Sequence, residues 1–173
     1  GVGQAPARQA AIYAGLTPAT VCMTINKVCG SGLKAVMLAA DSIRLGHSTI
    51  AIAGGQESMS LAPHLLENSR SGFRMGQASM TDSMIKDGLW DPYGNVHMGN
   101  LGDLCANEFH FTREMQDQFT VESYKNAQAA VEKGVFKNEI VPVSIETKKG
   151  TTLVEKDDEP FNPQFEKIPT LKP

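Results

Sequence analysis

Apolar and polar positions along the first third of the chain predict helices and strands in alternation. Residues 3–15 combine good helix formers with Pro6 near the start and Gly15 at the end, which is typical of a helix and its C-terminal cap. Mostly apolar runs at 21–28 and 49–53 are typical of strands. Between them, residues 33–45 predict a helix with one face suited to burial, formed by Leu33, Val36, Met37, Ala40 and Ile43. A helical crossover between two strands predicts parallel pairing, so the expected fold class is α/β.

Residues 56–99 interrupt this pattern with glycine, methionine, serine and asparagine, a composition typical of functional loops. We expect one short helix there, at 81–86. Two longer helices are predicted at 99–110 and 113–133, with Thr112 as the N-cap residue of the second. Residues 140–145 and 151–154 predict strands around a turn at 148–150. The proline-containing stretch 157–173 is expected to run over the surface.

Length and composition limit the classes of function. A compact domain of 173 residues would bury roughly 70% of its unfolded surface, enough for a hydrophobic core. A net charge of −3 without a basic block argues against a nucleic-acid partner, and the absence of a long apolar run or secretory signal argues against a membrane. Three cysteines without a C-x-x-C pair favour a reducing compartment. Four histidines without an H-x-x-x-H pattern argue against a metal site.

Cys29 is the residue with the clearest chemical potential, because it lies where a predicted strand ends and a predicted helix begins. Unpaired N–H groups at a helix N-terminus favour a thiolate, which is the nucleophilic form of cysteine. Gly30 and Gly32 leave room for an acyl group to approach the sulfur. The alternative is an inert, buried cysteine, a common environment for this residue type. Ser31 is a weaker candidate, because Cys29 occupies the place of the first glycine of a nucleophile elbow.

Several motifs together resemble one known family. The segment around the cysteine is Asn26-Lys27-Val28-Cys29-Gly30-Ser31-Gly32-Leu33-Lys34, and it resembles the nucleophilic-cysteine motif of the thiolases, specifically the acetyl-CoA acetyltransferases. Segments 1–10, 53–60, 97–99 and 112–117 are similar to further motifs of that family, in the same order. The resemblance implies a layered α/β/α N-terminal domain, present in part, with a mostly helical loop-domain excursion. Residues 1–55 would belong to the α/β domain, and residues 56–173 to the loop domain and the segment after it.

The resemblance also implies an activity and a set of site residues. Thiolases carry out reversible Claisen condensation of two acetyl-CoA molecules through an acyl-cysteine, and Cys29 matches their nucleophile. Four positions match the family's pantetheine channel and would contact coenzyme A there: Leu89, Tyr93, His97 and Met98. Lys167 would contact coenzyme A near its nucleotide. Tyr93 matches a tyrosine that helps to hold potassium in some members. Asn162 stands where relatives carry an arginine, which weakens the expected grip on the nucleotide.

The resemblance further implies that other parts of the family's machinery are not in this sequence. No Gly-His-Pro motif and no glycine-flanked second cysteine occur, and the family places both in its C-terminal half. We therefore expect an internal, N-terminal-half piece of a thiolase-like chain, inactive alone. The full-length protein would be a homodimer or homotetramer in the cytoplasm, or in the mitochondrial matrix of a eukaryote, with a role in fatty acid and lipid metabolism.

Three other hypotheses remain open from the sequence. The chain could be a non-catalytic folding or dimerisation fragment. It could belong to another cysteine-dependent condensing enzyme, such as a ketoacyl synthase or hydroxymethylglutaryl-CoA synthase, although His97-Met98-Gly99 favours a thiolase. A redox-sensing thiol protein is the weakest alternative, because no resolving cysteine lies near Cys29 in sequence.

Overall fold

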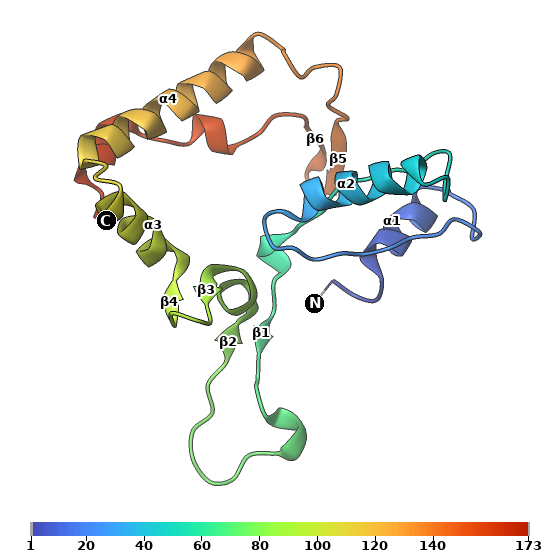
Figure 1. The fold of residues 1–173 in the computed structure, drawn as a ribbon, viewed down its shortest axis with the longest axis horizontal. Coiled ribbons are helices and arrows are strands. Elements are labelled where there is room, and N and C mark those ends of the chain that lie inside the picture. Colours follow the sequence, from blue (N-terminus) through green and yellow to red (C-terminus); the bar gives the residue numbers. More distant parts are fainter. Residues whose placement is uncertain (1, 173) are drawn as a thin grey trace. The chain divides into compact units, whose positions relative to one another are not determined.

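The computed structural model describes residues 2–172, and Figure 1 shows its helices and strands. The chain divides into two units, Gly1–Met98 and Gly99–Pro173. The first unit contains two α-helices, three short helical segments and two small antiparallel ladders. Its helices are α1 (Pro6–Tyr13) and α2 (Ser31–Arg44), with the short segments η1 (Met59–Leu61), η2 (Ser69–Ser71) and η3 (Ile85–Leu89). The ladders pair β1 (His64–Leu65) with β2 (Thr81–Asp82), and β3 (Trp90–Asp91) with β4 (Val96–His97).

The two longer helices predicted in the first unit are confirmed. Pro6 opens α1, where its missing N–H costs nothing, and Gly15 after that helix has φ 85°. Gly46 has φ 73° just beyond α2. The Arg8 guanidinium of α1 donates to the carbonyl oxygens of Pro18 and Thr20, both at 2.9 Å. This residue therefore ties α1 to the segment that leads toward Cys29.

The predicted parallel pairing of 21–28 with 49–53 is not formed. No strand is assigned at either segment, and the three sheets of the described residues are all two-stranded and antiparallel. Val21 is 96% exposed, and Ile52 is 84% exposed. A strand needs a hydrogen-bonded neighbour as well as a suitable side-chain pattern, and here the pattern lacks the neighbour. The α/β composition is retained, since helices and strands are both present.

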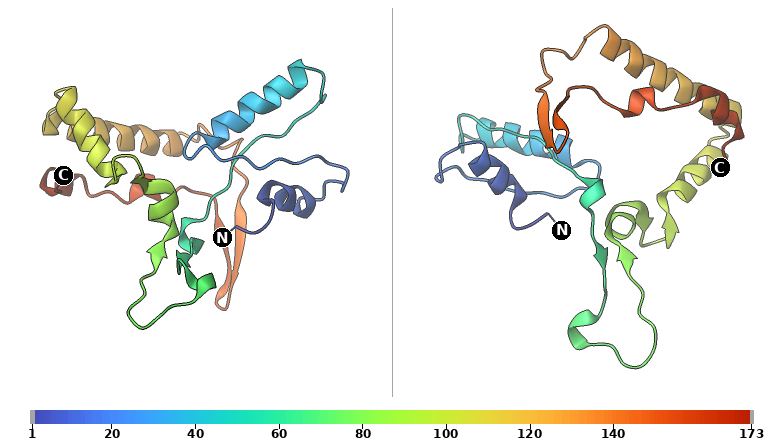
Figure 2. Two further views of the ribbon diagram at one scale, coloured as in Figure 1. Left: turned by 60° about the horizontal axis from the view of Figure 1, so that its bottom comes forward. Right: turned by 180° about the vertical axis from the view of Figure 1, so that it is seen from behind.

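The helix predicted at 81–86 begins later than expected. Thr81–Asp82 forms β2, and the chain becomes helical from residue 83, with a π-helical turn at Ile85–Leu89. The Asp82 carboxylate accepts a hydrogen bond from the Met84 backbone N–H at 2.8 Å, which caps this turn. A long loop that carries η2 connects β1 to β2, as two further views show (Figure 2).

The second unit agrees closely with the sequence pattern. It contains α3 (Met98–Glu108), which starts at the last residue of the first unit, and α4 (Arg113–Glu132). Thr112 is the N-cap of α4, because its hydroxyl accepts from the Met115 N–H at 3.2 Å. The predicted hairpin is present as β5 (Val143–Thr147) and β6 (Gly150–Val154). Two 3₁₀ segments follow, η4 (Glu159–Phe161) and η5 (Phe165–Thr170).

The expected hydrophobic core is not formed by the described residues. Among them, only Ile168 is a buried hydrophobic residue, with 8% exposure, and Ser83 is the only buried polar one. The face of α2 that the pattern assigns to burial is open to solvent, including Leu33 and Val36. No helix within residues 2–172 combines the length and the apolar character needed to cross a membrane.

Candidate active site

A tight turn places Cys29 directly before α2. The Asn26 side-chain oxygen accepts from the Val28 N–H at 2.8 Å. The Ser31 hydroxyl accepts from the Lys27 N–H at 2.8 Å and donates to the Val28 carbonyl at 2.6 Å. A backbone hydrogen bond also closes the turn, because the Gly30 N–H donates to the Lys27 carbonyl oxygen at 3.0 Å. The residues on both sides of Cys29 therefore hold the turn by themselves.

Val28 has a backbone conformation that valine seldom adopts. Its φ of 48° lies in the left-handed region, which branched side chains disfavour. Such a conformation costs about 1–3 kcal/mol and persists only where its surroundings hold it in place. The bonds from Asn26 and Ser31 do so here. Strain of this kind clusters at functional sites, which makes the residue after Val28 a stronger candidate for chemistry.

The environment of Cys29 differs from that of an inert, buried cysteine. Cys29 is free and exposed, and it precedes the helix start by two residues. Cys22 is half-buried, and its Sγ lies 3.5 Å from the Thr20 carbonyl oxygen, whereas Cys105 is exposed on α3. Cys29 therefore combines an accessible sulfur with a helix N-terminus, where backbone N–H groups can stabilise a negative charge that develops nearby.

Four of the predicted coenzyme A contacts come together on the β3–β4 hairpin and the residues next to it. Leu89 directly precedes β3 and is half-buried. Tyr93 lies in the hairpin turn and is 96% exposed. His97 pairs with Trp90 across the ladder, and Met98 follows as the first residue of α3. The hairpin and its neighbours thus carry two apolar side chains, an imidazole and a phenol within one short segment.

Two residues that the sequence reasoning overlooked give this hairpin its shape. Asp91 accepts hydrogen bonds from the backbone N–H groups of Tyr93, at 3.4 Å, and Gly94, at 2.7 Å. Asn95 has φ 54°, and its side-chain oxygen accepts from the Trp90 indole N–H at 3.1 Å. The sequence does indicate a turn here, because the segment Asp91-Pro92-Tyr93-Gly94-Asn95 is rich in residues that favour turns.

Lys167 belongs to the second unit and is exposed on η5. The Thr170 hydroxyl donates to its carbonyl oxygen at 2.7 Å. Along α4, the Tyr124 hydroxyl donates to Glu159 at 2.8 Å, and this bond raises the pKa of Tyr124. At the start of α4, the Glu114 backbone N–H and the Thr112 hydroxyl lower the pKa of Glu114.

Tyr93, which the resemblance connects with potassium, lies in the hairpin turn beside Asp91. Each Asp91 carboxylate oxygen accepts one backbone N–H bond there, from Tyr93 and from Gly94. The Tyr93 side chain itself is almost fully exposed. Within the part of the chain that the structure describes, no group of three or more His, Cys, Asp or Glu residues could hold a metal ion.

Comparison with known proteins gives a consistent result. The thiolase N-terminal domain family matches residues 1–173. An acetyl-CoA acetyltransferase of Cupriavidus necator is 57% identical over 159 residues, which is 92% of this chain and 40% of the relative. A mitochondrial acetyl-CoA acetyltransferase of Aspergillus fumigatus is 48% identical over 172 residues, 99% of this chain and 40% of the relative.

A solved structure shows the same fold. The crystal structure of a thiolase from Ascaris suum in complex with coenzyme A matches with a TM-score of 0.90 and 35% identity, over 100% of this chain and 43% of that one. The chain thus spans about 40% of the length of the curated relatives it matches. The family match over residues 1–173 and the relatives' identities together show that this chain belongs to the thiolase family.

Proposed function

We propose that the full-length protein, meaning one that carries this chain within the length of its curated relatives, is an acetyl-CoA acetyltransferase. The observation that carries the proposal is the exposed, free Cys29 at the start of α2, directly after the strained Val28. It stands in a chain that is 57% identical to a protein of that name. The same names disfavour the other condensing enzymes, a redox sensor and a purely structural fragment.

In the proposed first half-reaction, the Cys29 thiolate attacks the carbonyl carbon of acetyl-CoA. A new carbon–sulfur bond forms, the bond to coenzyme A breaks, and the released coenzyme A thiolate takes up a proton. This covalent step divides one difficult reaction into two easier ones. The N–H groups at the start of α2 are suited to stabilise negative charge in the transition state.

In the proposed second half-reaction, a second acetyl-CoA loses an α-proton to a base. Its α-carbon then attacks the acetyl-cysteine carbonyl, which yields acetoacetyl-CoA and regenerates the Cys29 thiolate. This sequence contains neither a Gly-His-Pro motif nor a glycine-flanked second cysteine, the segments in which the family carries its acid and base. We therefore assign the base to the part of the full-length protein outside this chain.

The binding assignments belong to the same proposal. Leu89, Tyr93, His97 and Met98 would contact pantetheine, because one short segment carries them all. Lys167 would contact the nucleotide end, where a lysine ammonium can hold phosphate as a point charge. The division into a catalytic α/β part, 1–55, and a loop domain with its following segment, 56–173, also belongs here. So do a homo-oligomeric state, a role in fatty acid and lipid metabolism, and a cytoplasmic or mitochondrial location.

A pair of cysteine variants tests the proposal in the full-length protein. Cys29→Ala should abolish acetoacetyl-CoA thiolysis, a loss on the order of 10⁴-fold or more. Cys105→Ala is the matched control, because Cys105 is also free and exposed, and it should retain activity. Mass spectrometry after mixing with acetyl-CoA should find an acetyl group on Cys29 alone. Full activity in Cys29→Ala, or acetylation at another residue, would refute the assignment.

A further inference from the structure

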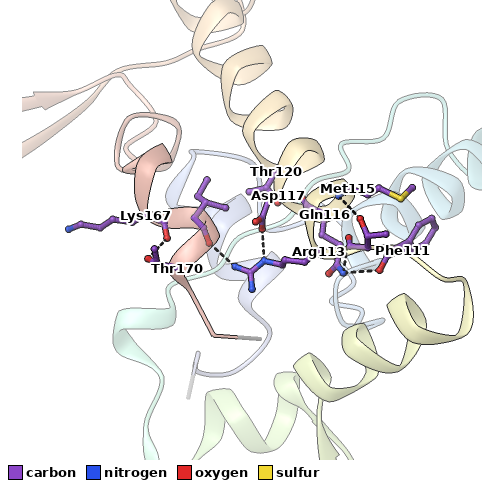
Figure 3. A network of polar contacts seen from close by, with 10 residues as sticks. Phe111, Arg113, Met115, Gln116, Asp117, Thr120, Lys167 and Thr170 are labelled. Atoms are coloured by element: carbon purple, nitrogen blue, oxygen red, sulfur yellow. Dashed lines mark hydrogen bonds and ion pairs between the residues drawn. The ribbon is translucent and has the colours of Figure 1, made fainter.

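Arg113, the first residue of α4, joins two segments that are far apart in the sequence. Its Nε donates to Asp117 Oδ1 at 2.7 Å, and its Nη2 donates to the Ile168 carbonyl oxygen at 2.7 Å. Figure 3 shows the guanidinium between the carboxylate on one side and the η5 carbonyl on the other. Arg113 thereby connects the start of α4 with η5, across 55 residues.

This contact fixes the direction of the η5 backbone. Asp117 lies one helical turn after Arg113, so its carboxylate sets the plane of the guanidinium. A guanidinium presents its donors in a rigid fork, so fixing one donor fixes the direction of the others. The side chains of Arg113 and Asp117 are only 36% and 21% exposed, and Ile168 is buried. Limited contact with water strengthens a charge-assisted bond of this kind.

Lys167 is the residue whose position this clamp controls most directly. It precedes Ile168, and its own carbonyl accepts the Thr170 hydroxyl at 2.7 Å. Its backbone N–H donates to the Gln164 carbonyl at 2.9 Å, so the main chain is held on both sides. The Lys167 side chain points away from Arg113 and out of the network (Figure 3). Lys167 is exposed, and the held backbone sets the point from which its side chain extends.

Lys167 is surrounded in the sequence by acidic residues, so the direction of its side chain affects how a phosphate could bind. Within residues 157–168 it is the single cation, among the carboxylates of Asp157, Asp158, Glu159 and Glu166. Asn162 contributes no charge there. An ammonium group held toward a phosphate attracts it and offsets repulsion from carboxylates in the same region.

We propose that Arg113 is a positioning residue for the nucleotide end of coenzyme A, and that it acts by holding η5 so that Lys167 meets the phosphates. The proposal rests on the assignment of Lys167 to the nucleotide under the proposed function. Arg113 itself makes no contact with the ligand. Its effect should therefore depend on the nucleotide of the ligand and on the presence of Lys167.

The first experiment measures dissociation constants of the full-length protein for coenzyme A and for pantetheine, which lacks the nucleotide. Calorimetry serves for coenzyme A, and NMR titration into the millimolar range serves for pantetheine. Arg113→Gln should weaken coenzyme A about tenfold, the size expected for loss of one charge-assisted contact, and leave pantetheine unchanged. Arg113→Lys should fall between, because an ammonium lacks the fork. Arg44→Gln is the matched control, since it removes an exposed arginine paired with Asp41 and should change neither constant.

The second experiment is a double-mutant cycle. If Arg113 acts through Lys167, Arg113→Gln should add little to the coenzyme A constant once Lys167→Gln is present. Equal weakening of both ligands, or effects of the two substitutions that multiply, would mean that Arg113 is only structural and would overturn the proposal. Coenzyme A binding in the absence of acetyl transfer would refute the proposed enzyme activity but leave this test intact. Failure of the wild-type protein to bind coenzyme A would overturn both.

Discussion

Ser31 is the residue on which the geometry around Cys29 depends most. Its hydroxyl accepts from the Lys27 N–H and donates to the Val28 carbonyl, so it spans the turn from both sides. Asn26 adds a third bond at the Val28 N–H. Together these bonds keep Val28 at φ 48° against its own preference. The Ser31 hydroxyl therefore acts on the nucleophile through the backbone of the turn.

Ser31→Ala should lower both stability and activity of the full-length protein. It removes two hydrogen bonds, each worth about 0.5–1.5 kcal/mol of unfolding free energy. The turn would then relax toward an unstrained Val28 and move the Cys29 sulfur, so the rate of Cys29 acetylation should fall. Denaturant unfolding and rapid-quench mass spectrometry measure the two effects. Ser31→Thr retains the hydroxyl and should stay near wild type; equal acetylation rates in Ser31→Ala would show that the turn does not place the sulfur.

At this scale the sequence predicts the position of the nucleophile but not the geometry that holds it. Cys29 could be found because the end of an apolar run, two glycines and a helical pattern are all local signals. The left-handed Val28 could not, because a branched residue argues against that conformation. The hydrogen bond from Arg113 to the Ile168 carbonyl could not be predicted either, since 55 residues separate the two.

The β3–β4 hairpin is the element that gathers most of the proposed pantetheine contacts. Its turn depends on Asp91, which bonds to two backbone N–H groups. A Cβ on Gly94 would come within 2.8 Å of an Asp91 carboxylate oxygen, so another residue there would shift the carboxylate that holds the turn. Tyr93, in the turn itself, and His97, on β4, depend on the turn for their spacing.

Asp91→Ala should therefore weaken coenzyme A and pantetheine alike. Loss of both bonds frees the turn, with an expected cost of about 1 kcal/mol in unfolding free energy and about a fivefold rise in both dissociation constants. Asp91→Asn keeps one acceptor oxygen and should lie between. The same titrations as for Arg113 measure the outcome. A change confined to coenzyme A would mean that the hairpin serves the nucleotide end instead.

Helix α4 is the element that holds the stretch around η4 and η5. Besides the Arg113 clamp, the Tyr124 hydroxyl donates to Glu159, and the Gln128 amide donates to the Pro160 carbonyl at 2.7 Å. The Tyr124 ring meets Phe165 edge to face, with centroids 6.2 Å apart. On the same helix, Tyr124 packs against η5, whereas Phe119 is 72% exposed.

The bond from Tyr124 to Glu159 predicts a dependence on alkaline pH. It raises the pKa of Tyr124 above the ordinary value of 10.0, so the neutral phenol is favoured in the folded state. Its contribution to stability is complete below pH 10 and is lost as the pH rises through the folded pKa. The ultraviolet difference between wild type and Tyr124→Phe isolates this titration. Glu159→Gln should shift it back toward the ordinary value, and an unshifted titration would contradict the bond.

At the scale of the whole molecule, the elements set by local sequence are predicted correctly, whereas the long-range strand pairing is not. All four α-helices and the β5–β6 hairpin follow from the sequence, because periodicity, capping residues and turn residues act over a few positions. The parallel pairing of 21–28 with 49–53 does not form, and the apolar face of α2 remains exposed. Both require partners that the local pattern does not specify.

The exposed apolar side chains and the isolated Cys29 lead to one prediction about residues 1–173 alone. Large exposed apolar surface drives association, so this chain by itself should form soluble oligomers or aggregates, visible by light scattering. It should show no acetoacetyl-CoA thiolysis, because carbon–carbon chemistry needs a base in the same pocket as the thiolate. The full-length protein should be active and should scatter light as a defined species.

A thiolysis assay on both proteins at equal Cys29 concentration decides this prediction. Loss of one member of a coupled catalytic set costs several orders of magnitude, so background turnover is expected from the shorter chain. Iodoacetamide labelling of Cys29 serves as the control that its sulfur is accessible in both. Turnover by the shorter chain at the full-length rate would show that its own residues supply the base, and His97 would then be the first candidate to replace.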